Sequence, residues 1–389
     1  MAKKIRLAYT AAALIPLSVL AAACGSSSPS PTSSNSSTPA AAAMMGAALP
    51  TSPAKTPETV TETGSTLLYP LMGSWSEAYQ KAFPVSSTSS SPLVTIETGG
   101  TGSGTGISDA AAGTVDIGAS DAYLSSSDMT TYPSLMNIAL AISAQQFNYN
   151  LPTVKTPLKL DGTVVAEMYT GKITKWNDPA IAALNPGVSL PDITVVPLHR
   201  ADGSGDTFLF TSYLNAQDPG AWPTANVGTT ISWPSVSGAL AEEGNGGMVT
   251  GCAATKGCIA YIGISYESKT QAAGLGQAEL KNGAGQFEAP TSATISAEAS
   301  ALTSKTPASE TLSMIDANAS GGYPIVNYEY AIVSKKQTNG TVAEDMRAFL
   351  YWTVHTGQSA TDYLSAVNFE PLPASVVTLT DNQIAKIGS

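Results

Sequence analysis

Short apolar segments with two different spacings alternate along most of the chain. Residues 67–83 place apolar side chains at helical spacing, whereas residues 93–98 are rich in β-branched side chains and indicate a strand. The alternation continues towards the C-terminus: helices are expected over 106–113, 162–171, 206–216 and 341–355, and extended segments over 115–120, 135–151 and 193–200. Strands and helices that alternate in this way predict an α/β fold.

The N-terminal region does not follow this pattern. Basic residues at positions 3, 4 and 6 precede an apolar stretch over residues 7–23, which is too short and too closely followed by polar sequence to favour a spanning helix. A run of small residues then ends at Cys24, as at the cleavage site of bacterial lipoproteins. We expect residues 1–23 to be a signal peptide and Cys24 to carry a lipid such as palmitate. Ordinary secretion is the alternative, because its signal has the same architecture.

A polar, low-complexity segment follows the signal. Residues 25–57 are rich in Ser, Thr, Pro, Ala and Gly, and Lys55 is their single charge. Such a composition buries too little apolar surface to offset the entropy of an ordered chain. We therefore expect residues 24–59 to form a flexible tether that starts at the membrane surface.

The charge and hydrophobicity of the chain argue against two classes of protein, those that bind nucleic acid and those that span a membrane. The chain of 389 residues has a formal net charge of −11, a pI near 4.6 and 12% charged residues. Nucleic-acid binding requires basic stripes that meet phosphate groups, so this composition argues against it. No sustained apolar run follows residue 23, which argues against a membrane-spanning protein.

Two cysteines remain beyond the signal, Cys252 and Cys258, in the segment GCAATKGC. An even pair in an exported protein suggests a disulfide that closes a short loop, and two unpaired thiols are the alternative. A metal site would need more ligands than two cysteines, and no histidine is near them. We expect no metal there.

Three glycine-bearing turns share one design. Residues 62–70, 99–110 and 199–210 each place Gly, Ser or Thr directly before a helical pattern. Glycine allows main-chain N–H groups to approach a ligand closely, and a helix N-terminus offers free N–H donors with a partial positive charge. Each turn alone is also explained by ordinary helix capping. Three together, with Arg200 in the third, predict a site for an oxyanion.

Asp121 is expected to influence which anion this site binds. It follows the expected strand over 115–120, and capping of the next helix is its alternative role. An ionised carboxylate accepts hydrogen bonds but cannot donate them. Hydrogen phosphate keeps a proton that it can donate to such a group, whereas sulfate at neutral pH has none. An aspartate in the anion site therefore favours a protonated oxyanion.

Several motifs resemble one family closely. The PstS family of phosphate-binding lipoproteins, which are the substrate-binding components of phosphate ABC importers, is similar to this chain from about residue 60 to residue 389, and its mycobacterial-type members are the most similar. The resemblance rests on the segments ETGSTLLYPL, GTGSGTGI, VDIGASDAYLS, MNIALAISAQQ, VVPLHRADGSGDTFLFT, GNGGMVTGC, YIGIS and YPIVNYEYAIV.

The resemblance implies a two-lobed periplasmic-binding-protein fold of the α/β class, type II-like, with phosphate in the cleft between the lobes. Lobe 1 would consist of residues 60–147 and 328–389, and lobe 2 of residues 148–327. The chain would cross between the lobes near residues 146–152 and 323–332.

The resemblance also implies a set of ligands to phosphate. Asp202 matches a position that pairs with the arginine and does not touch phosphate. At Asp206 the enterobacterial pattern has threonine and the mycobacterial type has aspartate, so contact through its side chain or through its N–H stays open. The implied phosphate ligands are Ser65, Thr66, Leu67, Ser103, Asp121, Arg200, Ser204, Gly205 and Asp206.

The expected function is phosphate binding outside the cytoplasmic membrane and delivery to the permease of the ABC importer. The protein is then a lipid-anchored monomer on the extracytoplasmic face, with no cofactor, no enzymatic activity and no nucleic-acid partner. The alternatives are an exported phosphohydrolase with the same anion site and a surface adhesin. A hydrolase needs a metal cluster or an activated nucleophile, and the two histidines, His199 and His355, lie at unrelated positions.

Overall fold

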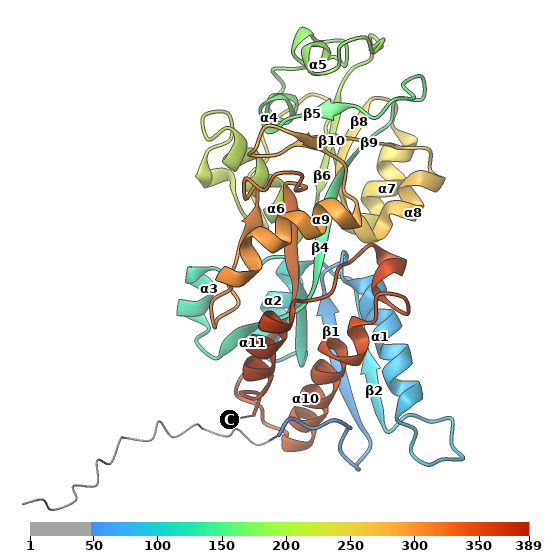
Figure 1. The fold of residues 1–389 in the computed structure, drawn as a ribbon, viewed down its shortest axis with the longest axis vertical. Coiled ribbons are helices and arrows are strands. Elements are labelled where there is room, and N and C mark those ends of the chain that lie inside the picture. Colours follow the sequence, from blue (N-terminus) through green and yellow to red (C-terminus); the bar gives the residue numbers. More distant parts are fainter. Residues whose placement is uncertain (1–47, 389) are drawn as a thin grey trace, which may run out of the picture. The chain divides into compact units, whose positions relative to one another are not determined.

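A computed structural model of the chain describes residues 48–388. The expected signal peptide, Cys24 and most of the tether lie outside the described residues. From residue 58 onwards, strands and helices alternate as the sequence predicts, and the fold is α/β (Figure 1). The helices are α1 Tyr69–Ala82, α2 Ser103–Ala112, α3 Ser126–Thr131, α4 Gly162–Tyr169, α5 Pro179–Leu184, α6 Gly205–Gln217, α7 Gly244–Ala254, α8 Glu267–Ala272, α9 Ser292–Leu302, α10 Gly340–Val354 and α11 Ala374–Ile384.

The main sheet has the strand order β2-β1-β3-β13-β4-β8-β6-β7, and β12 (Met314–Ile315) and β9 (Gly276–Gln277) pair beside β13 and β4. A small second sheet contains β5 (Lys159–Leu160), β10 (Glu279–Lys281) and β11 (Phe287–Glu288). The strands of the main path are β1 Glu58–Gly64, β2 Val94–Glu97, β3 Ile117–Ser120, β4 Leu135–Tyr149, β6 Val196–Arg200, β7 Leu240–Glu242, β8 Cys258–Gly263 and β13 Ile325–Ser334.

Strand β4 connects two groups of strands within this sheet. All 15 of its residues are buried, and it forms one continuous strand within the extended segment expected over 135–151. From Leu135 to Ala144 it pairs with β13, and from Gln145 to Tyr149 it pairs with β8. The change of partner between Ala144 and Gln145 falls close to the first crossing expected from the sequence. The lobe boundaries themselves stay a prediction.

Parallel strands stand on both sides of β4 and β13. Strand β1 is parallel to β2 and β3, and β6 is parallel to β7 and β8, whereas β13 and β4 run antiparallel to their neighbours. The segments that leave the carboxyl ends of β1, β3 and β6 contain Ser65, Asp121 and Asp202. Ligands of open α/β sheets commonly bind beyond such strand ends.

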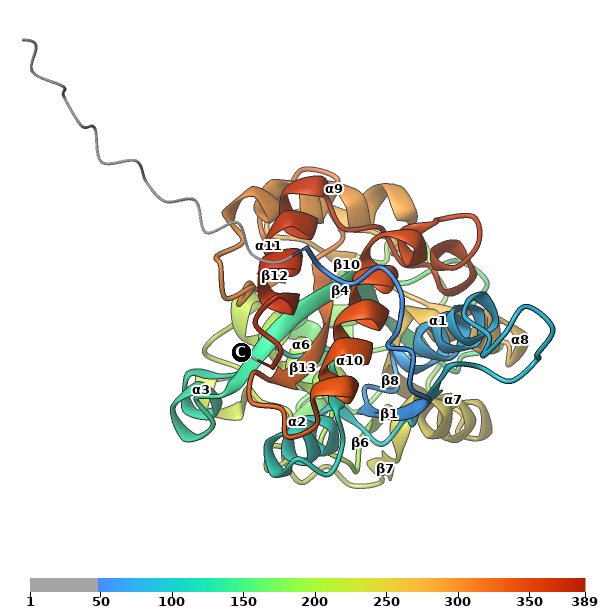
Figure 2. The same ribbon diagram turned by 90° about the horizontal axis from the view of Figure 1, so that it is seen from below.

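Helices cover both groups of strands. Helices α10 and α11 pack side by side, α10 on β1 and α11 on β4 (Figures 1 and 2). Helix α2 packs on β3 and β1, and α6 packs on α4 and β8. Large aromatic side chains fill the space beneath the helices: Tyr79 contacts Phe349 with ring centroids 5.2 Å apart, and Phe210 stacks on Tyr261 at 4.4 Å.

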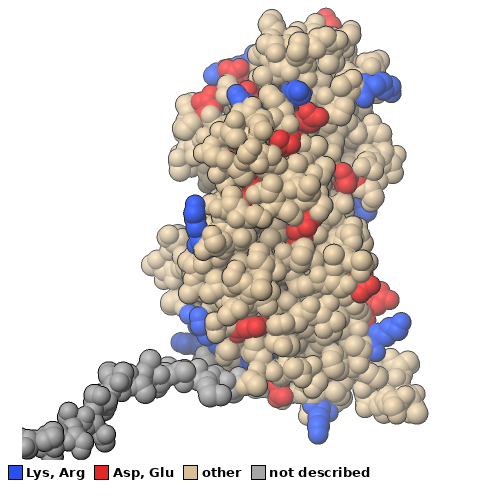
Figure 3. Space-filling model, in the orientation of Figure 1, with Lys and Arg blue, Asp and Glu red and all other residues tan. Residues whose placement is uncertain are grey.

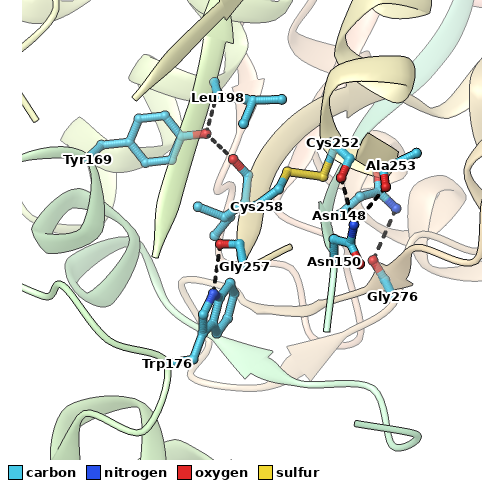
Figure 4. The surroundings of a disulfide bond; sticks show 11 residues. Asn148, Asn150, Tyr169, Trp176, Leu198, Cys252, Ala253, Gly257, Cys258 and Gly276 are labelled. Atoms are coloured by element: carbon cyan, nitrogen blue, oxygen red, sulfur yellow. Dashed lines mark hydrogen bonds between the residues drawn. A yellow bond between two sulfur atoms is a disulfide. The ribbon is translucent and has the colours of Figure 1, made fainter. Parts of the chain in front are cut away.

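Cys252, near the end of α7, and Cys258, the first residue of β8, form a disulfide with a Cα–Cα distance of 5.3 Å (Figure 4). Both cysteines are buried. Asn150, next to the end of β4, donates from Nδ2 to the carbonyl oxygens of Cys252 and Ala253, each at 2.9 Å. The disulfide and these bonds join α7, β8 and β4.

Charged side chains are dispersed on the molecular surface. On the face in Figure 3, basic and acidic side chains are scattered among uncharged residues. Within residues 48–388, no helix combines the length and the apolar character needed to cross a bilayer.

A candidate anion site at three helix N-termini

The first turn joins β1 to α1. Gly64 has a φ of +144°, and an added Cβ would collide with the main chain of Ala119, so glycine is required there. Ser65 caps the turn, because its Oγ accepts from Leu68 N at 2.8 Å and its carbonyl accepts from Tyr69 N at 3.0 Å. The side chains of Ser65 and Leu67 are fully buried.

The second turn leads into α2. Gly102 precedes the helix with a φ of +95°, and its Cα faces Asp202 and Gly203. Ser103, the first residue of α2, lies beside Asp121: its Oγ is 3.3 Å from Asp121 Oδ2 and accepts from Asp121 N at 3.2 Å. The second turn and the end of β3 therefore meet.

The third turn leads into α6. Ser204 caps this helix, accepting with Oγ from Thr207 N at 3.4 Å. A Cβ on Gly205 would lie 2.6 Å from both Ser103 Oγ and Asp121 Oδ2. Gly104 N, in α2, donates to Gly203 O at 2.9 Å. The third turn therefore packs directly against the second, with Asp121 between them.

Free main-chain donors remain at these helix starts. Within the described part of the chain, the N–H groups of Thr66, Leu67, Gly205 and Asp206 donate no hydrogen bond, and all four residues are buried. The first N–H groups of a helix lack partners inside the helix and carry the positive end of its dipole. Buried N–H groups of this kind need an acceptor, and an oxyanion supplies several.

The guanidinium of Arg200, at the end of β6, lies between two carboxylates. Its Nε donates to Asp202 Oδ1 at 2.7 Å, its Nη2 donates to Asp202 Oδ2, and its Nη1 donates to Asp206 Oδ2 at 3.0 Å. The arginine side chain is 1% exposed. Burial acts to raise the pKa of Asp202, but the hydrogen bonds and charge of Arg200 outweigh it, so this pKa lies below its ordinary value.

The carboxylate of Asp206 is occupied by protein donors. Besides Arg200, its Oδ2 accepts from Asn245 Nδ2 at 2.7 Å, and its Oδ1 accepts from Gln145 Nε2 at 3.0 Å. Its main-chain N–H is one of the free donors described above. This arrangement favours contact with a ligand through the N–H of Asp206.

Asp121 is buried and accepts from hydroxyl groups at both oxygens. Its Oδ1 accepts from Ser65 Oγ, and its Oδ2 faces Ser103 Oγ. Burial, followed by the charge of Asp206, raises the pKa of Asp121 to about 7, although Ser65, Glu329 and Arg200 act in the opposite direction. The structure thus brings all nine predicted ligands and Asp202 into one cluster.

Three other residues of this cluster were not singled out from the sequence. Asn245, in α7, donates from Nδ2 to Thr66 Oγ1 at 2.9 Å as well as to Asp206. Gln145 lies where β4 changes partner, and Glu329, on β13, lies 3.5 Å from Ser65 Oγ. Glu329 could have been noticed in the sequence, because it is a charged residue inside an otherwise apolar segment. Asn245 and Gln145 could not, because their contacts join segments that are distant in the sequence.

Comparisons with known proteins show the family of the chain. A family model described as a PBP superfamily domain matches residues 49–356. The chain is 31% identical over 315 residues to phosphate-binding protein PstS of Xylella fastidiosa, covering 81% of each chain. It is 31% identical over 342 residues to phosphate-binding protein PstS of Haemophilus influenzae (86% of this chain and 95% of the relative). It is also 31% identical over 296 residues to phosphate-binding protein PstS3 of Mycobacterium bovis (72% and 76%).

Solved structures share the fold. A phosphate-binding protein from Stenotrophomonas maltophilia superposes with a TM-score of 0.62 at 20% identity, over 83% of this chain and 93% of that one. A high-affinity periplasmic phosphate-binding protein crystallised with phosphate gives a TM-score of 0.62 at 22% identity, over 84% and 93%.

Proposed function

Because the chain belongs to the PBP superfamily and, within it, to the PstS family of phosphate-binding proteins, we propose that it binds inorganic phosphate outside the cytoplasmic membrane and delivers it to the permease of an ABC importer. One observation carries the proposal: three helix N-termini with free N–H groups meet at a buried arginine and a buried aspartate.

In this proposal each group has one task. The N–H groups of Thr66, Leu67, Gly205 and Asp206 donate to phosphate oxygens, with the hydroxyl groups of Ser103 and Ser204 beside them. Arg200 supplies the positive charge. Asp202 holds the guanidinium of Arg200 in one orientation, because it accepts from Nε and from Nη2. Ser65 holds Asp121 in place.

Asp121 selects the anion. With Oδ1 bound to Ser65, its Oδ2 accepts the proton of hydrogen phosphate. Sulfate brings no proton, so its oxygen would face the carboxylate oxygen without a hydrogen bond, in a buried site where an unpaired charged acceptor costs about 1–3 kcal/mol or more. Arsenate has the same shape as phosphate and also keeps a proton that it can donate to Asp121, so we expect the site to bind it too.

We propose further that phosphate closes two lobes around itself. Contacts between segments assigned to different lobes support this: Asn245 binds Thr66, Gly104 binds Gly203, and Ser265 Oγ donates to Leu67 O at 2.7 Å. The proposed boundaries are residues 60–147 with 328–389 for lobe 1, and residues 148–327 for lobe 2.

The site serves transport and not catalysis in this proposal, since relatives that match most of the chain are named phosphate-binding proteins. The chain is a monomer held on the membrane by a lipid on Cys24, and the part of the expected tether that precedes Ala54 gives the receptor its reach to the permease. The expected boundary at residue 59 is too late, because Ala54 is buried and donates its N–H to Asp345 Oδ1 at 2.7 Å, and β1 begins at Glu58. Detergent-phase partitioning of wild type and Cys24→Ala checks the anchor, which fails if the variant still partitions with detergent.

Calorimetry on purified protein stripped of bound anion tests the function. We expect one phosphate per chain, similar binding of arsenate, and sulfate binding weaker by at least about 100-fold, equivalent to about 2.7 kcal/mol. Equal affinities for phosphate and sulfate, or no heat with phosphate, would refute the proposed function. Hydrolysis of p-nitrophenyl phosphate that tracks the purified protein would favour the hydrolase alternative.

A further inference from the structure

A second buried carboxyl group stands behind Asp121. Glu329, on β13, is fully buried, and its Oε2 lies 3.5 Å from Ser65 Oγ. Its strand shifts register against β4 between Glu329 and Tyr330, and such bulges redirect side chains beside functional sites. The hydroxyl groups of the strand neighbours Tyr328 and Tyr330 bind elsewhere, to Thr306 and to the carbonyl of Glu310.

Counting protons at Ser65 shows that the two carboxyl groups cannot both be ionised and satisfied. A serine hydroxyl has one proton and two lone pairs. Ser65 Oγ already accepts from Leu68 N and donates to Asp121 Oδ1. Its remaining lone pair can only accept, so Glu329 Oε2 makes a hydrogen bond to it only if Oε2 carries a proton.

The other oxygen of Glu329 is arranged as the carbonyl of a neutral acid. Its Oε1 lies 2.5 Å from Ser143 Oγ and accepts from Asn327 Nδ2 at 3.0 Å. Ser143 Oγ also lies 2.8 Å from Asn327 Oδ1, and its single proton goes to the nearer acceptor, Oε1. With the Ser143 proton directed to Oε1, a protonated Glu329 would have its own proton and both lone pairs of Oε1 matched: two donors to Oε1, and one bond from Oε2 to Ser65. An ionised Glu329 would leave Oε2 buried without a donor, which is costly.

The surrounding charges favour the neutral acid as well. Of the described residues around these carboxyl groups, Arg200 is the one cation, and Asp202 and Asp206 already pair with it. Strand β4 and Glu329's own strand contribute the neutral groups Ser143 and Asn327, and the end of β3 contributes Asp121. Burial, followed by the charge of Asp121, raises the pKa of Glu329 well above its ordinary value.

We propose that Glu329 is a positioning residue for anion selection: it keeps a proton, donates it to Ser65 and thereby commits the Ser65 hydroxyl to Asp121. The inference rests on the proposed phosphate function. Through this chain, from Glu329 to Ser65 to Asp121, Oδ1 of Asp121 is committed to Ser65. Its Oδ2 faces Ser103 Oγ at 3.3 Å and keeps a lone pair for the proton of phosphate. Loss of the proton from Glu329 would place a second negative charge behind the site and weaken anion binding.

Glu329→Gln mimics the protonated acid, because its amide can donate to Ser65 and its oxygen can accept from Ser143 and Asn327. We expect this variant to bind phosphate within about threefold of wild type at neutral pH. As the pH is raised above neutrality, Glu329 of the wild type loses its proton and the amide of the variant does not, so the wild type should lose affinity relative to the variant by at least about fivefold. Taking the ratio of the two dissociation constants at each pH cancels the titration of phosphate itself.

Glu329→Leu removes every hydrogen bond at similar volume and should weaken phosphate binding at least about tenfold. Glu310→Gln is the matched control. Glu310 is also a fully buried carboxyl with a pKa raised by burial to about 7, but it binds Ala139 N and Thr380 Oγ1 away from the site. This control should track wild type at every pH.

Infrared spectroscopy of stripped protein supplies a readout without ligand. The difference spectrum between wild type and Glu329→Gln at neutral pH should contain the carbonyl band of a protonated carboxylic acid and no band of a carboxylate. A carboxylate band, a ratio of dissociation constants that stays flat with pH, or a loss of more than tenfold in Glu329→Gln would each overturn the inference. Failure of wild type to bind phosphate would instead overturn the proposed function, and the infrared result would still decide the protonation of Glu329.

Discussion

At the scale of residues, the described part of the chain places more carboxyl groups than cations in the site: Asp121, Asp202 and Asp206 lie around the single guanidinium of Arg200. Asp202 and Asp206 both pair with Arg200, whereas Asp121 has hydroxyl groups as partners and a pKa raised, chiefly by burial, to about 7. A carboxyl group with such a pKa is poised between two roles. Ionised, it accepts the proton of phosphate, and protonated, it becomes a donor that would tolerate sulfate.

Asp121→Asn should therefore lower the ratio of phosphate affinity to sulfate affinity. In wild type, sulfate binding should strengthen as the pH falls below about 7, because a growing share of Asp121 becomes protonated and sulfate itself does not titrate there. In the variant, whose amide always donates, this rise should be absent. Competition calorimetry measures both quantities. Ratios that agree within about threefold, roughly 0.65 kcal/mol, would show that selectivity does not reside in Asp121.

Asp206 serves as the control for that experiment, because three protein donors already bind its carboxylate. Asp206→Asn should weaken both anions by disturbing Arg200, with a smaller change in their ratio. If Asp206→Asn changed the ratio of phosphate affinity to sulfate affinity as much as Asp121→Asn does, the side chain of Asp206 would also discriminate between the two anions.

At the scale of elements, the site depends on how closely helix starts can approach one another. Gly205 opens α6 directly against Ser103 and Asp121, and no larger residue fits this contact. Glycine lowers the intrinsic stability of a helix relative to alanine, so its presence there is explained by the close approach and not by helix formation.

Gly205→Ala should weaken phosphate binding by at least about 30-fold, or about 2 kcal/mol, because a Cβ would lie 2.6 Å from Ser103 Oγ and Asp121 Oδ2. Gly340→Ala is the matched control: Gly340 likewise opens a helix, α10, and a Cβ there meets nothing within 4 Å. Calorimetry with phosphate and a thermal melt of each variant separate binding from stability. Equal affinities of the two variants would contradict the close packing of α6 on the site.

The sequence predicted those elements that show a clear period. The helix expected over 206–216 is confirmed as α6, Gly205–Gln217, and the strand over 115–120 as β3, Ile117–Ser120. Helix α7 was not predicted, because its glycine-rich sequence GNGGMVTGCAA has little periodicity. The three turns were visible because glycine and hydroxyl residues gather before helices. Asn245 was not, because its partner Thr66 lies on a distant segment.

At the scale of the whole molecule, binding and closure are expected to be one event. The proposed ligands come from segments on both sides of the point where β4 changes partner. A ligand that joins groups which separate in an open state shifts the population towards the closed state. The contacts of Asn245 with Thr66 and of Gly104 with Gly203 would then form only on closure.

Small-angle scattering of stripped protein, with and without phosphate, measures this closure. The radius of gyration should decrease when phosphate is added and should not change with sulfate at the same ionic strength. Asn245→Ala should shift the stripped protein further towards the open state, because it removes donors to both Thr66 and Asp206. An unchanged radius of gyration on addition of phosphate would argue against two lobes that close on the ligand.

The pairing of β4 with β13 also constrains how the molecule folds after export. Leu135 pairs with Ser334, and β13 occupies the position between β3 and β4, so the first group of strands is incomplete until residues near the C-terminus are present. Pairings between such distant segments raise the contact order and slow folding. A chain emerging N-terminus first would therefore expose the unpaired edges of β3 and β4 until β13, which ends at Ser334, has left the export channel. During this interval the chain is most prone to aggregate or to need a chaperone.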